Sequence, residues 1–291
     1  MNITPTAIPD AWKRLDTGSM HGVLMVLGAP DVGKSTFARY LYLRLVSEGK
    51  RAAFLDGDPG QSVLGPPTTI ILAVGQPGEG QFPPDGEVRR WFIGSVTPSG
   101  HMLQLLVGAS RLVQAAFTLG VEIVIYDTSG LVDPAKGGLA LKQAKIDLLR
   151  PAAVYAIQSG DELEALLIPL RRSQRTGIID LEAAPEARQR NTPTRQAYRS
   201  EQFASYFQNA RQLSLSWTRW PVFPAPHFAL EGLISFDDAE GFSRELGVVT
   251  ELDRKTHTMT VLTPLRSLEG IGSIKLGDTN LDRSGFRDYR V

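Results

Sequence analysis

The sequence predicts an α/β protein: a doubly wound parallel sheet built around a phosphate-binding loop (P-loop), followed by a small C-terminal β domain. The first observation is that apolar strand-like runs alternate with helical patterns over residues 21–181, as in βαβ units. The second is a glycine-rich loop between the first such strand and the first helix. The third is a change, after about residue 210, to alternating segments interrupted by prolines. We therefore expect a P-loop domain over residues 1–209, including a helix near its end, and a β domain over residues 210–291.

Composition narrows the class of protein. The 291 residues are 42% hydrophobic and 21% charged, with a formal net charge of zero, so no global field draws the chain to nucleic acid or membrane. The absence of cysteine excludes disulfides, thiolate catalysis and cysteine zinc sites. We see no leader pattern and no run of ~18 apolar residues that could span a membrane. We expect a cytoplasmic protein with no membrane partner.

The phosphate-binding loop is the most specific local pattern. Residues 28–36 read GAPDVGKST and fit G-x-x-x-x-G-K-[ST], between an apolar strand at 23–27 and a helix that Gly49 ends. Backbone N–H groups at such a helix N-terminus bind phosphate. An ordinary glycine turn with a solvated lysine is the alternative, which the matching context disfavours. The predicted nucleotide-binding residues are Gly28, Asp31, Val32, Gly33, Lys34, Ser35 and Thr36, with Lys34 at the β/γ-phosphates and Ser35 on Mg²⁺.

The next strands end in polar residues. Residues 51–55 predict a strand that runs into the sequence DGDPGQ at 56–61, and ligands bind at the carboxyl ends of such strands. Residues 69–74 predict another strand and 75–90 a loop. A short strand at 91–94 leads into the hydroxyl-rich turn SVTPSG at 95–100.

A second carboxylate follows the next βα repeat. Residues 103–119 predict a helix, and 121–126 predict a buried strand that ends in DTSG at 127–130. Asp127 is then the expected partner of the Mg²⁺ shell, with a helix-cap or turn role as the alternative. A helix over 137–149, a strand at 153–157, a helical segment at 161–172 and a strand at 177–181 complete the sheet.

The segment 171–199 is locally basic, with seven arginines and three acidic residues. Arg195 and Arg199 lie four apart on a helix that begins near Pro193, so they share a face. Two adjacent guanidinium groups favour an anion such as phosphate, although a solvated basic face is the alternative. Before the first strand, residues 11–15 predict at most one helical turn, with a surface lead-in preferred.

The remaining pattern is β-rich. Residues 213–217 alternate, 221–226 are proline-rich, and 230–236 predict a strand. Residues 245–253 and 258–263 predict a hairpin, and a strand follows at 274–276.

Together these motifs resemble the polynucleotide 5′-hydroxyl kinases that include the pre-mRNA cleavage-complex kinase and the ribosomal-RNA-processing kinase. The resemblance rests on GAPDVGKST at 28–36, DGDPGQ at 56–61, GSVTP at 94–98, DTSG at 127–130 and the R-x-x-x-R pair. It extends into the β domain and covers most of residues 22–277. The phosphate loop alone is unspecific, whereas the combination with D-x-D-x-G-Q is much more specific.

The resemblance implies roles for the matched residues. Asp58 looks like the base that accepts the proton of the substrate 5′-hydroxyl, and Asp56 or Asp127 would support Mg²⁺. Residues 94–98 look like a clasp for the substrate end, and Arg195 and Arg199 like a lid over the transferring phosphoryl group. The implied catalytic residues are Lys34, Asp58, Arg195 and Arg199; the implied substrate-binding residues are Gln61, Ser95, Thr97 and Thr128. The cofactors are ATP or another nucleoside triphosphate and Mg²⁺, and the partners are 5′-OH ends of RNA or DNA.

The sequence departs from the family pattern in two places. About 20 residues precede the first strand, so we expect the N-terminal β domain of eukaryotic relatives to be missing. Leu131 stands where relatives often carry a Trp, so any stacking on a substrate base must come from elsewhere, such as Trp91 or Phe92, or be weaker.

Three other functions compete with a polynucleotide kinase. One is a regulatory GTPase or metal-delivery NTPase, but the guanine-reading N-K-x-D motif and cysteines are absent from the sequence. Another is a nucleotide-binding adaptor of an RNA-processing complex, which the intact Lys34 and Asp58 disfavour. A small-molecule kinase is the third, and the β domain is its main difficulty. We expect the kinase to act in RNA processing or nucleic-acid repair.

Overall fold

The computed structural model describes residues 8–78, 80–183 and 190–290. The chain divides into two compact units that interleave along the sequence. The first unit contains Met1–Asp58, Leu72–Val88 and Leu105–Arg190, and the second contains Pro59–Ile71, Arg89–Gln104 and Asn191–Val291. The helix predicted to act as a lid thus falls in the same unit as the C-terminal strands. The domain boundary at residue 209 stays a prediction.

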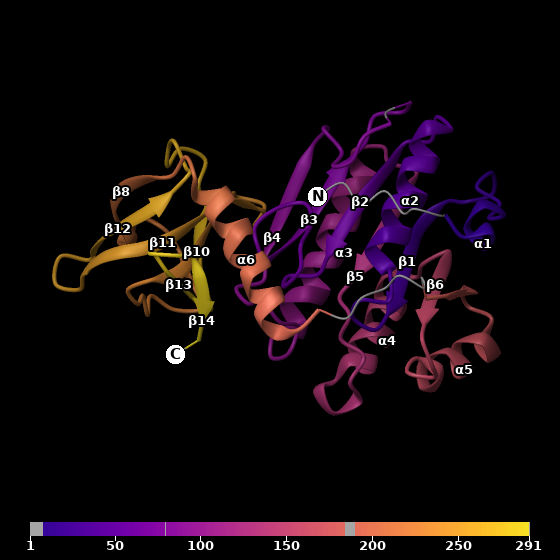
Figure 1. The fold of residues 1–291 in the computed structure, drawn as a ribbon. Coiled ribbons are helices and arrows are strands. Elements are labelled where there is room, and N and C mark those ends of the chain that lie inside the picture. The colour runs from indigo at the N-terminus through magenta and orange to yellow at the C-terminus, as the bar shows by residue number, and fades with distance from the viewer. Residues whose placement is uncertain (1–7, 79, 184–189, 291) are drawn as a thin grey trace. The chain divides into compact units, whose positions relative to one another are not determined.

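The first unit alternates strands and helices (Figure 1). Its elements are α1 (Asp10–Lys13), β1 (Gly22–Gly28), α2 (Lys34–Ser47), β2 (Ala52–Gly57), β5 (Ile123–Thr128), the 3₁₀ turn η1 (Pro134–Lys136), α4 (Gly138–Leu149), β6 (Ala153–Gln158), α5 (Glu164–Ser173) and β7 (Gly177–Glu182). Three elements have residues in both units: β3 (Thr69–Val74), β4 (Val88–Phe92) and α3 (Met102–Thr118).

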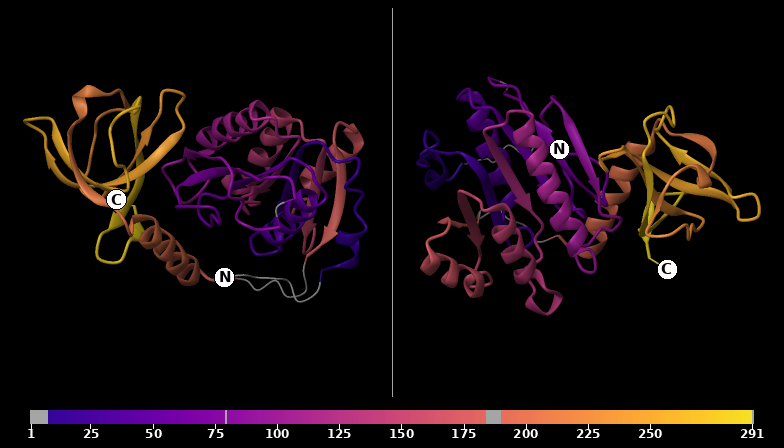
Figure 2. Two further views of the ribbon diagram at one scale, coloured as in Figure 1. Left: turned by 90° about the horizontal axis from the view of Figure 1, so that it is seen from above. Right: turned by 180° about the vertical axis from the view of Figure 1, so that it is seen from behind.

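The strands of the first unit form a parallel sheet in the order β2-β5-β1-β6-β7. The chain moves from β1 to β2 in one direction and from β5 to β6 in the other. Because such crossovers are right-handed, α2 covers one face of the sheet and α4 and α5 the other (Figure 2). The α/β fold class is confirmed. The reversal of direction lies between β1 and β5, where open sheets of this kind bind ligands at the carboxyl ends of the strands.

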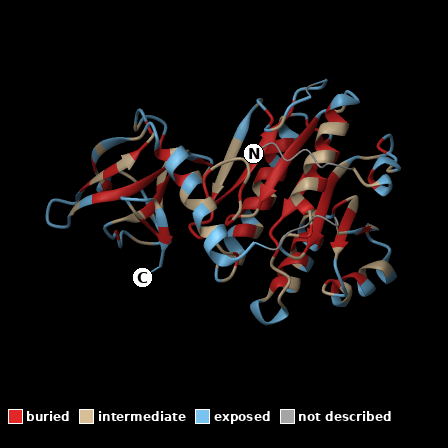
Figure 3. Ribbon diagram, in the orientation of Figure 1, coloured by how far each residue is buried: buried red, intermediate tan, exposed pale blue. Residues whose placement is uncertain are grey.

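The central strands are apolar because both of their faces are covered. All six residues of β2 and all six of β5 are buried, as Figure 3 shows in red. At the N-terminus, α1 is a real helical turn and not the surface lead-in we preferred, because Trp12 is buried. Its indole meets the Phe37 ring edge-on at 5.1 Å and lies 5.6 Å from the Tyr40 ring.

One strand boundary differs from the prediction. β4 begins at Val88, inside the segment expected to be a loop, and ends at Phe92. The charges of Arg89 and Arg90 hide the strand pattern. The structure uses Arg90 at the strand surface, where its guanidinium donates to the Arg244 carbonyl oxygen at 3.1 Å.

The second unit contains one long helix and a set of mainly antiparallel strands. Its elements are α6 (Thr192–Phe207), β8 (Arg211–Ser216), the 3₁₀ turn η2 (Trp217–Arg219), β9 (Val222–Phe223), β10 (Gly232–Asp237), β11 (Ser243–Asp253), β12 (Thr258–Thr263), β13 (Ser273–Asp282) and β14 (Arg287–Tyr289). The strand order is β14-β13-β10-β11-β4, with β12 joining β11 to β8 and β9 running parallel to β13. The predicted hairpin is the pair β11–β12.

Two apolar clusters hold the second unit together. One lies under β8 to β13 and includes Trp217, Phe236 and Val261. The other joins α6 to the strands through Phe203 and Phe207. In the described part of the chain, none of the helices is both long and apolar enough to cross a bilayer.

Candidate active site

The phosphate loop connects β1 to α2, and its residue types permit the backbone conformations that this tight connection needs. Gly33, the N-cap of α2, has a φ of +97°, a conformation that residues with a Cβ rarely adopt. A Cβ on Gly28 would lie 2.4 Å from the Ile157 carbonyl oxygen, so only glycine fits there. Asp31 also adopts a positive φ, of +62°. The loop therefore turns tightly and presents the N-terminus of α2 to an anion.

Lys34 is the first residue of α2 and is almost fully buried. Its Nζ donates to the Ala29 carbonyl oxygen at 2.6 Å, inside the loop itself. Burial lowers the pKa of the Lys34 ammonium, while the charges of Asp127, Asp58 and Asp31 act in the opposite direction. Lys34 thus places a largely desolvated cation at the N-terminus of α2, where the backbone N–H groups also favour a phosphate.

Asp127 is the last residue but one of β5 and is paired in register with Val26 of β1 and Asp56 of β2. Burial raises the pKa of its carboxyl group to about 6, while the charge of Lys34 and a hydrogen bond with the Ser35 side chain oppose that rise. Among the described residues, Oδ1 of Asp127 has no hydrogen-bond partner. A buried carboxylate oxygen left unpaired normally requires an explanation, such as an ion.

These donors fit Mg²⁺. The ion prefers oxygen ligands and is usually held by one or two carboxylates together with substrate phosphates. The Ser35 hydroxyl and the Asp127 carboxylate supply such oxygens, and Asp56 is a second carboxylate nearby. No group of three or more His, Cys, Asp or Glu suited to a metal occurs among the described residues, so a cation here would take its further ligands from phosphates and water.

Asp56 and Asp58 differ in exposure although they are two residues apart. Asp56 is buried in β2, and its Oδ1 accepts a hydrogen bond from the Asp58 backbone N–H at 3.3 Å. Asp58 lies one residue beyond the strand and is only half-buried. Asp58 is therefore the more accessible of the two, as a group that exchanges a proton with a substrate must be.

The DTSG segment is fixed from two sides. The Thr128 hydroxyl donates to the Val26 carbonyl oxygen at 2.7 Å, so this hydrogen bond links the end of β5 to β1. The buried Lys142 of α4 donates from Nζ to the Ser129 carbonyl oxygen at 2.9 Å. Sequence reasoning missed Lys142 because a helical lysine is normally solvated, and no local pattern marks its burial.

The structure also assigns a partner to Asp31. The Arg190 backbone N–H and Nε donate to its two carboxylate oxygens at 2.9 and 3.0 Å. The Asp31 side chain is 4% exposed and that of Arg190 is 44% exposed. Arg190 belongs to the basic segment predicted from the sequence; Arg188 of that segment lies outside the described residues. The pair anchors residue 190, just before α6, to the tip of the phosphate loop.

The predicted clasp residues belong to the second unit. Ser95 is buried, and its oxygen accepts from the Thr97 backbone N–H at 3.3 Å and from the Arg290 guanidinium. The Asp278 backbone N–H donates to the Gly94 carbonyl oxygen at 3.0 Å, so β13 anchors the turn. Thr97 is half-buried and therefore more accessible than Ser95. Arg290 and Asp278 could not be found from the sequence, because they lie far along the chain from the clasp.

Gln61 and the arginine pair also lie in the second unit. Gln61 Nε2 donates to the Gly60 carbonyl oxygen at 2.6 Å and to that of Arg195 at 3.4 Å. Arg195 is half-buried near the start of α6, whose N-cap is Asn191. Arg199, one turn later, forms an ion pair with Asp288 at 2.8 Å. The anion that Arg199 was expected to attract is therefore, in this structure, a carboxylate of β14.

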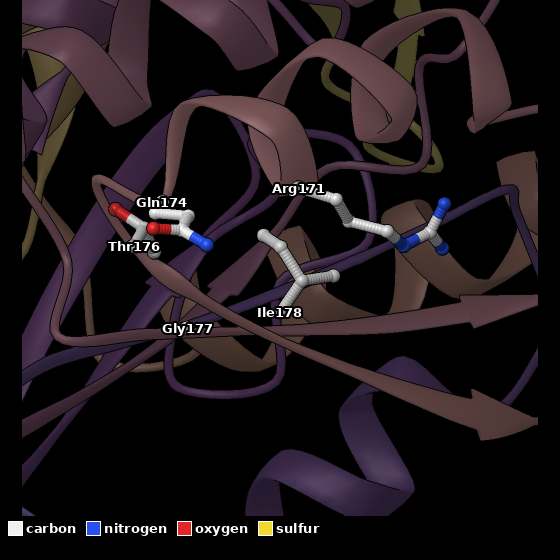
Figure 4. A pocket seen from close by; sticks show the side chains of 5 residues that line it. All are labelled: Arg171, Gln174, Thr176, Gly177 and Ile178. Atoms are coloured by element: carbon white, nitrogen blue, oxygen red, sulfur yellow. The ribbon is translucent and has the colours of Figure 1, made fainter.

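A hollow of about 320 Å³ lies between α5 and β7 (Figure 4). It is lined by Arg171, Gln174, Thr176, Gly177 and Ile178. The Arg171 guanidinium is already paired with Glu164 at 2.8 Å and with Asp180 at 2.7 Å. None of the predicted site residues lines this hollow, and we assign it no role in the chemistry.

Comparison with known proteins gives one family. Residues 28–209 match the sequence model of the family described as mRNA cleavage and polyadenylation factor CLP1 P-loop. A polyribonucleotide 5′-hydroxyl-kinase of Pyrococcus furiosus is 31% identical over 209 residues, which are 71% of this chain and 56% of that protein. A polyribonucleotide 5′-hydroxyl-kinase of Pyrococcus abyssi is 24% identical over an alignment of 332 residues that covers 94% of this chain and 92% of the relative.

Solved structures share the fold. A chain of the wild-type Clp1p–Pcf11p (454–563) complex superposes with a TM-score of 0.67 at 11% identity, covering 91% of this chain and 76% of that one.

Proposed function

The chain belongs to the family described as mRNA cleavage and polyadenylation factor CLP1 P-loop, and from this premise we propose that it is an ATP-dependent polynucleotide 5′-hydroxyl kinase. In this reaction the γ-phosphoryl group of ATP, or of another nucleoside triphosphate, passes to the 5′-hydroxyl of RNA or DNA. The observation that carries the proposal is the buried Lys34 on a phosphate loop amid the charges of Asp31, Asp58 and Asp127. The archaeal relatives named polyribonucleotide 5′-hydroxyl-kinases support the choice of acceptor.

The phosphate loop supplies binding and charge. The backbone N–H groups at the start of α2 hold the phosphate oxygens, and the Lys34 ammonium leaves the Ala29 carbonyl oxygen to bind the β- and γ-phosphates. Ser35 and Asp127, with Asp56 beside them, would hold Mg²⁺, which neutralises phosphate charge when bound. Phosphoryl transfer needs little covalent help from protein, so alignment and charge account for most of the catalysis.

Asp58 is the proposed general base. It accepts the proton of the substrate 5′-hydroxyl as that oxygen forms its bond to the γ-phosphorus, and the bond from the γ-phosphorus to the bridging oxygen breaks to release ADP. Its greater exposure, compared with the buried Asp56, supports this assignment. Arg195 is proposed to stabilise charge on the transferring group. Gln61, Thr97 and the turns that contain Ser95 and Thr128 are proposed to shape the substrate site.

The test is transfer of label from γ-labelled ATP, in the presence of Mg²⁺, to RNA and DNA oligonucleotides of one sequence. Matched oligonucleotides that already carry a 5′-phosphate serve as the control. We expect label on the 5′-OH ends only, with a preference between RNA and DNA that the assay reports directly. Release of labelled phosphate without transfer would instead indicate a regulatory or assembly NTPase.

The Lys34→Ala variant makes the same test specific to the site. We expect it to abolish transfer, because it removes the cation from the β/γ-phosphates. Burial lowers the pKa of the Lys34 ammonium, which means that the folded protein pays free energy to keep this charge. Removing the side chain should therefore leave the circular dichroism spectrum and the melting temperature close to those of wild type. Near-wild-type transfer by this variant contradicts the site assignment.

A further inference from the structure

Helix α6 is fixed along its C-terminal half by apolar packing. Phe203 and Phe207 are buried in a cluster with residues of β10, β11 and β13, among them Leu233, Leu246 and Leu281. The adjacent Tyr206 hydroxyl hydrogen-bonds Glu245 and accepts from the Leu246 backbone N–H at 2.8 Å. This half of the helix cannot move without the C-terminal strands, and Figure 1 shows it beside them.

The N-terminal half of α6 is fixed by a polar contact instead. Nε and Nη2 of Arg199 donate to the two carboxylate oxygens of Asp288 at 2.8 and 3.0 Å. The Gln196 side-chain amide donates to the Asp288 carbonyl oxygen at 3.1 Å. Two side chains from the same face of α6, those of Gln196 and Arg199, therefore both donate hydrogen bonds to Asp288 of β14.

Burial makes this ion pair stronger than an ordinary surface pair. The Arg199 and Asp288 side chains are 13% and 8% exposed. A two-point guanidinium–carboxylate contact fixes orientation as well as distance, and removing one partner leaves the other charge largely desolvated. Asp288 takes the edge of the Arg199 guanidinium formed by Nε and Nη2, so the ion pair fixes the direction in which the rest of the group faces.

On its other side, α6 is joined to the segment that follows Asp58. The Tyr198 hydroxyl donates to the Ser62 carbonyl oxygen at 2.8 Å. The Gln61 amide donates to the Arg195 carbonyl oxygen, as described above. The first two turns of α6 thus lie between β14 and the residues immediately after the proposed general base.

We propose that Asp288 is a positioning residue for the transfer reaction. Through Arg199 it sets the rotation of α6, and with it the direction of Arg195 and the path of residues 59–62 that continue from Asp58. Arg199 acts through this ion pair and does not itself contact the transferring phosphoryl group. The C-terminal β strands consequently contribute to catalysis by holding the helix. This inference rests on the proposed kinase function and deepens it.

The test begins with Asp288→Asn in the full-length protein, assayed with 5′-OH oligonucleotide, ATP and Mg²⁺. We expect kcat to fall by on the order of 10- to 100-fold, the scale of a small misplacement of catalytic groups. The Kd for ADP and the KM for oligonucleotide should change little, because Asp288 contacts neither. Asp288→Glu, which keeps the charge, should recover part of the loss. Wild-type kcat in Asp288→Asn overturns the inference.

The charge exchange Arg199→Asp with Asp288→Arg distinguishes positioning from direct contact. It preserves an ion pair but moves the cation to β14. We expect the double variant to regain most of the kcat that Asp288→Asn loses. A double variant with wild-type melting temperature but no recovery overturns the inference, because it would show that Arg199 itself acts on the phosphoryl group.

A neighbouring residue provides the matched control. Tyr289 follows Asp288 on β14, and its hydroxyl donates to Glu231 at 2.6 Å. Tyr289→Phe should leave kcat unchanged; a loss equal to that of Asp288→Asn would make the effect one of strand stability and overturn the inference. Wild-type protein that transfers no label to any oligonucleotide contradicts the proposed function, whereas active wild type with unaffected Asp288 variants contradicts this inference alone.

Discussion

Asp127→Asn should stabilise the nucleotide-free protein while removing its activity. The carboxyl group is buried, and its pKa of about 6 lies above the value of 3.8 for an ordinary Asp. Each pH unit between these values corresponds to about 1.36 kcal/mol. At neutral pH the ionised carboxylate therefore costs the folded protein about 3 kcal/mol, and a neutral amide of the same shape avoids that cost.

The stability difference between Asp127→Asn and wild type should depend on pH. Because the folded protein holds the Asp127 proton more tightly than the unfolded chain does, stability due to this group is fully present below about pH 3.8 and is lost as pH rises to about 6. Asp127→Asn should thus be about as stable as wild type near pH 4, and more stable by up to about 3 kcal/mol above pH 6.5. The kcat/KM of wild type should fall below about pH 6, where the carboxylate becomes protonated.

Urea unfolding without nucleotide or Mg²⁺, followed by circular dichroism at pH 4 and pH 7.5, measures the difference. Asp147→Asn, which neutralises an exposed carboxylate on α4, is the control and should change the unfolding free energy by less than about 0.5 kcal/mol. A constant difference between Asp127→Asn and wild type at the two pH values refutes the reasoning. So does a variant that is less stable than wild type at pH 7.5.

Two further substitutions test the base and the N-terminal turn. Asp58→Asn should lower kcat by ~10²–10⁴-fold with little change in the Kd for ATP, because the amide keeps the shape but cannot accept a proton; if Asp56→Asn proves the more damaging in single-turnover kinetics, the two roles are exchanged. Trp12→Ala should cost about 3–5 kcal/mol of unfolding free energy, since it removes a buried indole packed on Phe37. Lys13→Ala, an exposed neighbour, should shift the urea midpoint very little, and equal losses in both variants would contradict the packing argument.

The first unit could be predicted well because its signals are local. Apolar strands, glycine caps and the phosphate-loop pattern each specify structure within about ten residues, and the carboxyl ends of β1, β2 and β5 meet because parallel strands place them at one edge. The position of Lys34, Ser35, Asp56 and Asp127 at this edge therefore follows from the sequence, while their roles stay predictions. Trp12 was underestimated because a four-residue helix has too few positions to show an apolar face.

The partners of these residues could not be predicted because they are distant in sequence. Nothing near Arg199 indicates Asp288, and nothing near Asp31 indicates Arg190. The spacing of residues on a helix shows which side chains share a face. It does not show which other element packs against that face. The burial of Lys142 is hidden for the same reason, because α4 carries lysines on the side that covers the sheet.

The interleaving of the two units has a consequence for synthesis on the ribosome. Phe92 packs with Leu233, Leu246 and Leu281, which the ribosome adds much later. The segment 89–104, which contains Phe92, therefore lacks these contacts until the last strands emerge. A nascent chain that stalls before β13 would leave the Phe92 ring without these partners, even after the phosphate-loop sheet has formed. A recombinant fragment that ends at residue 209 would separate Phe203 and Phe207 from the same late strands, so aggregation is its expected fate.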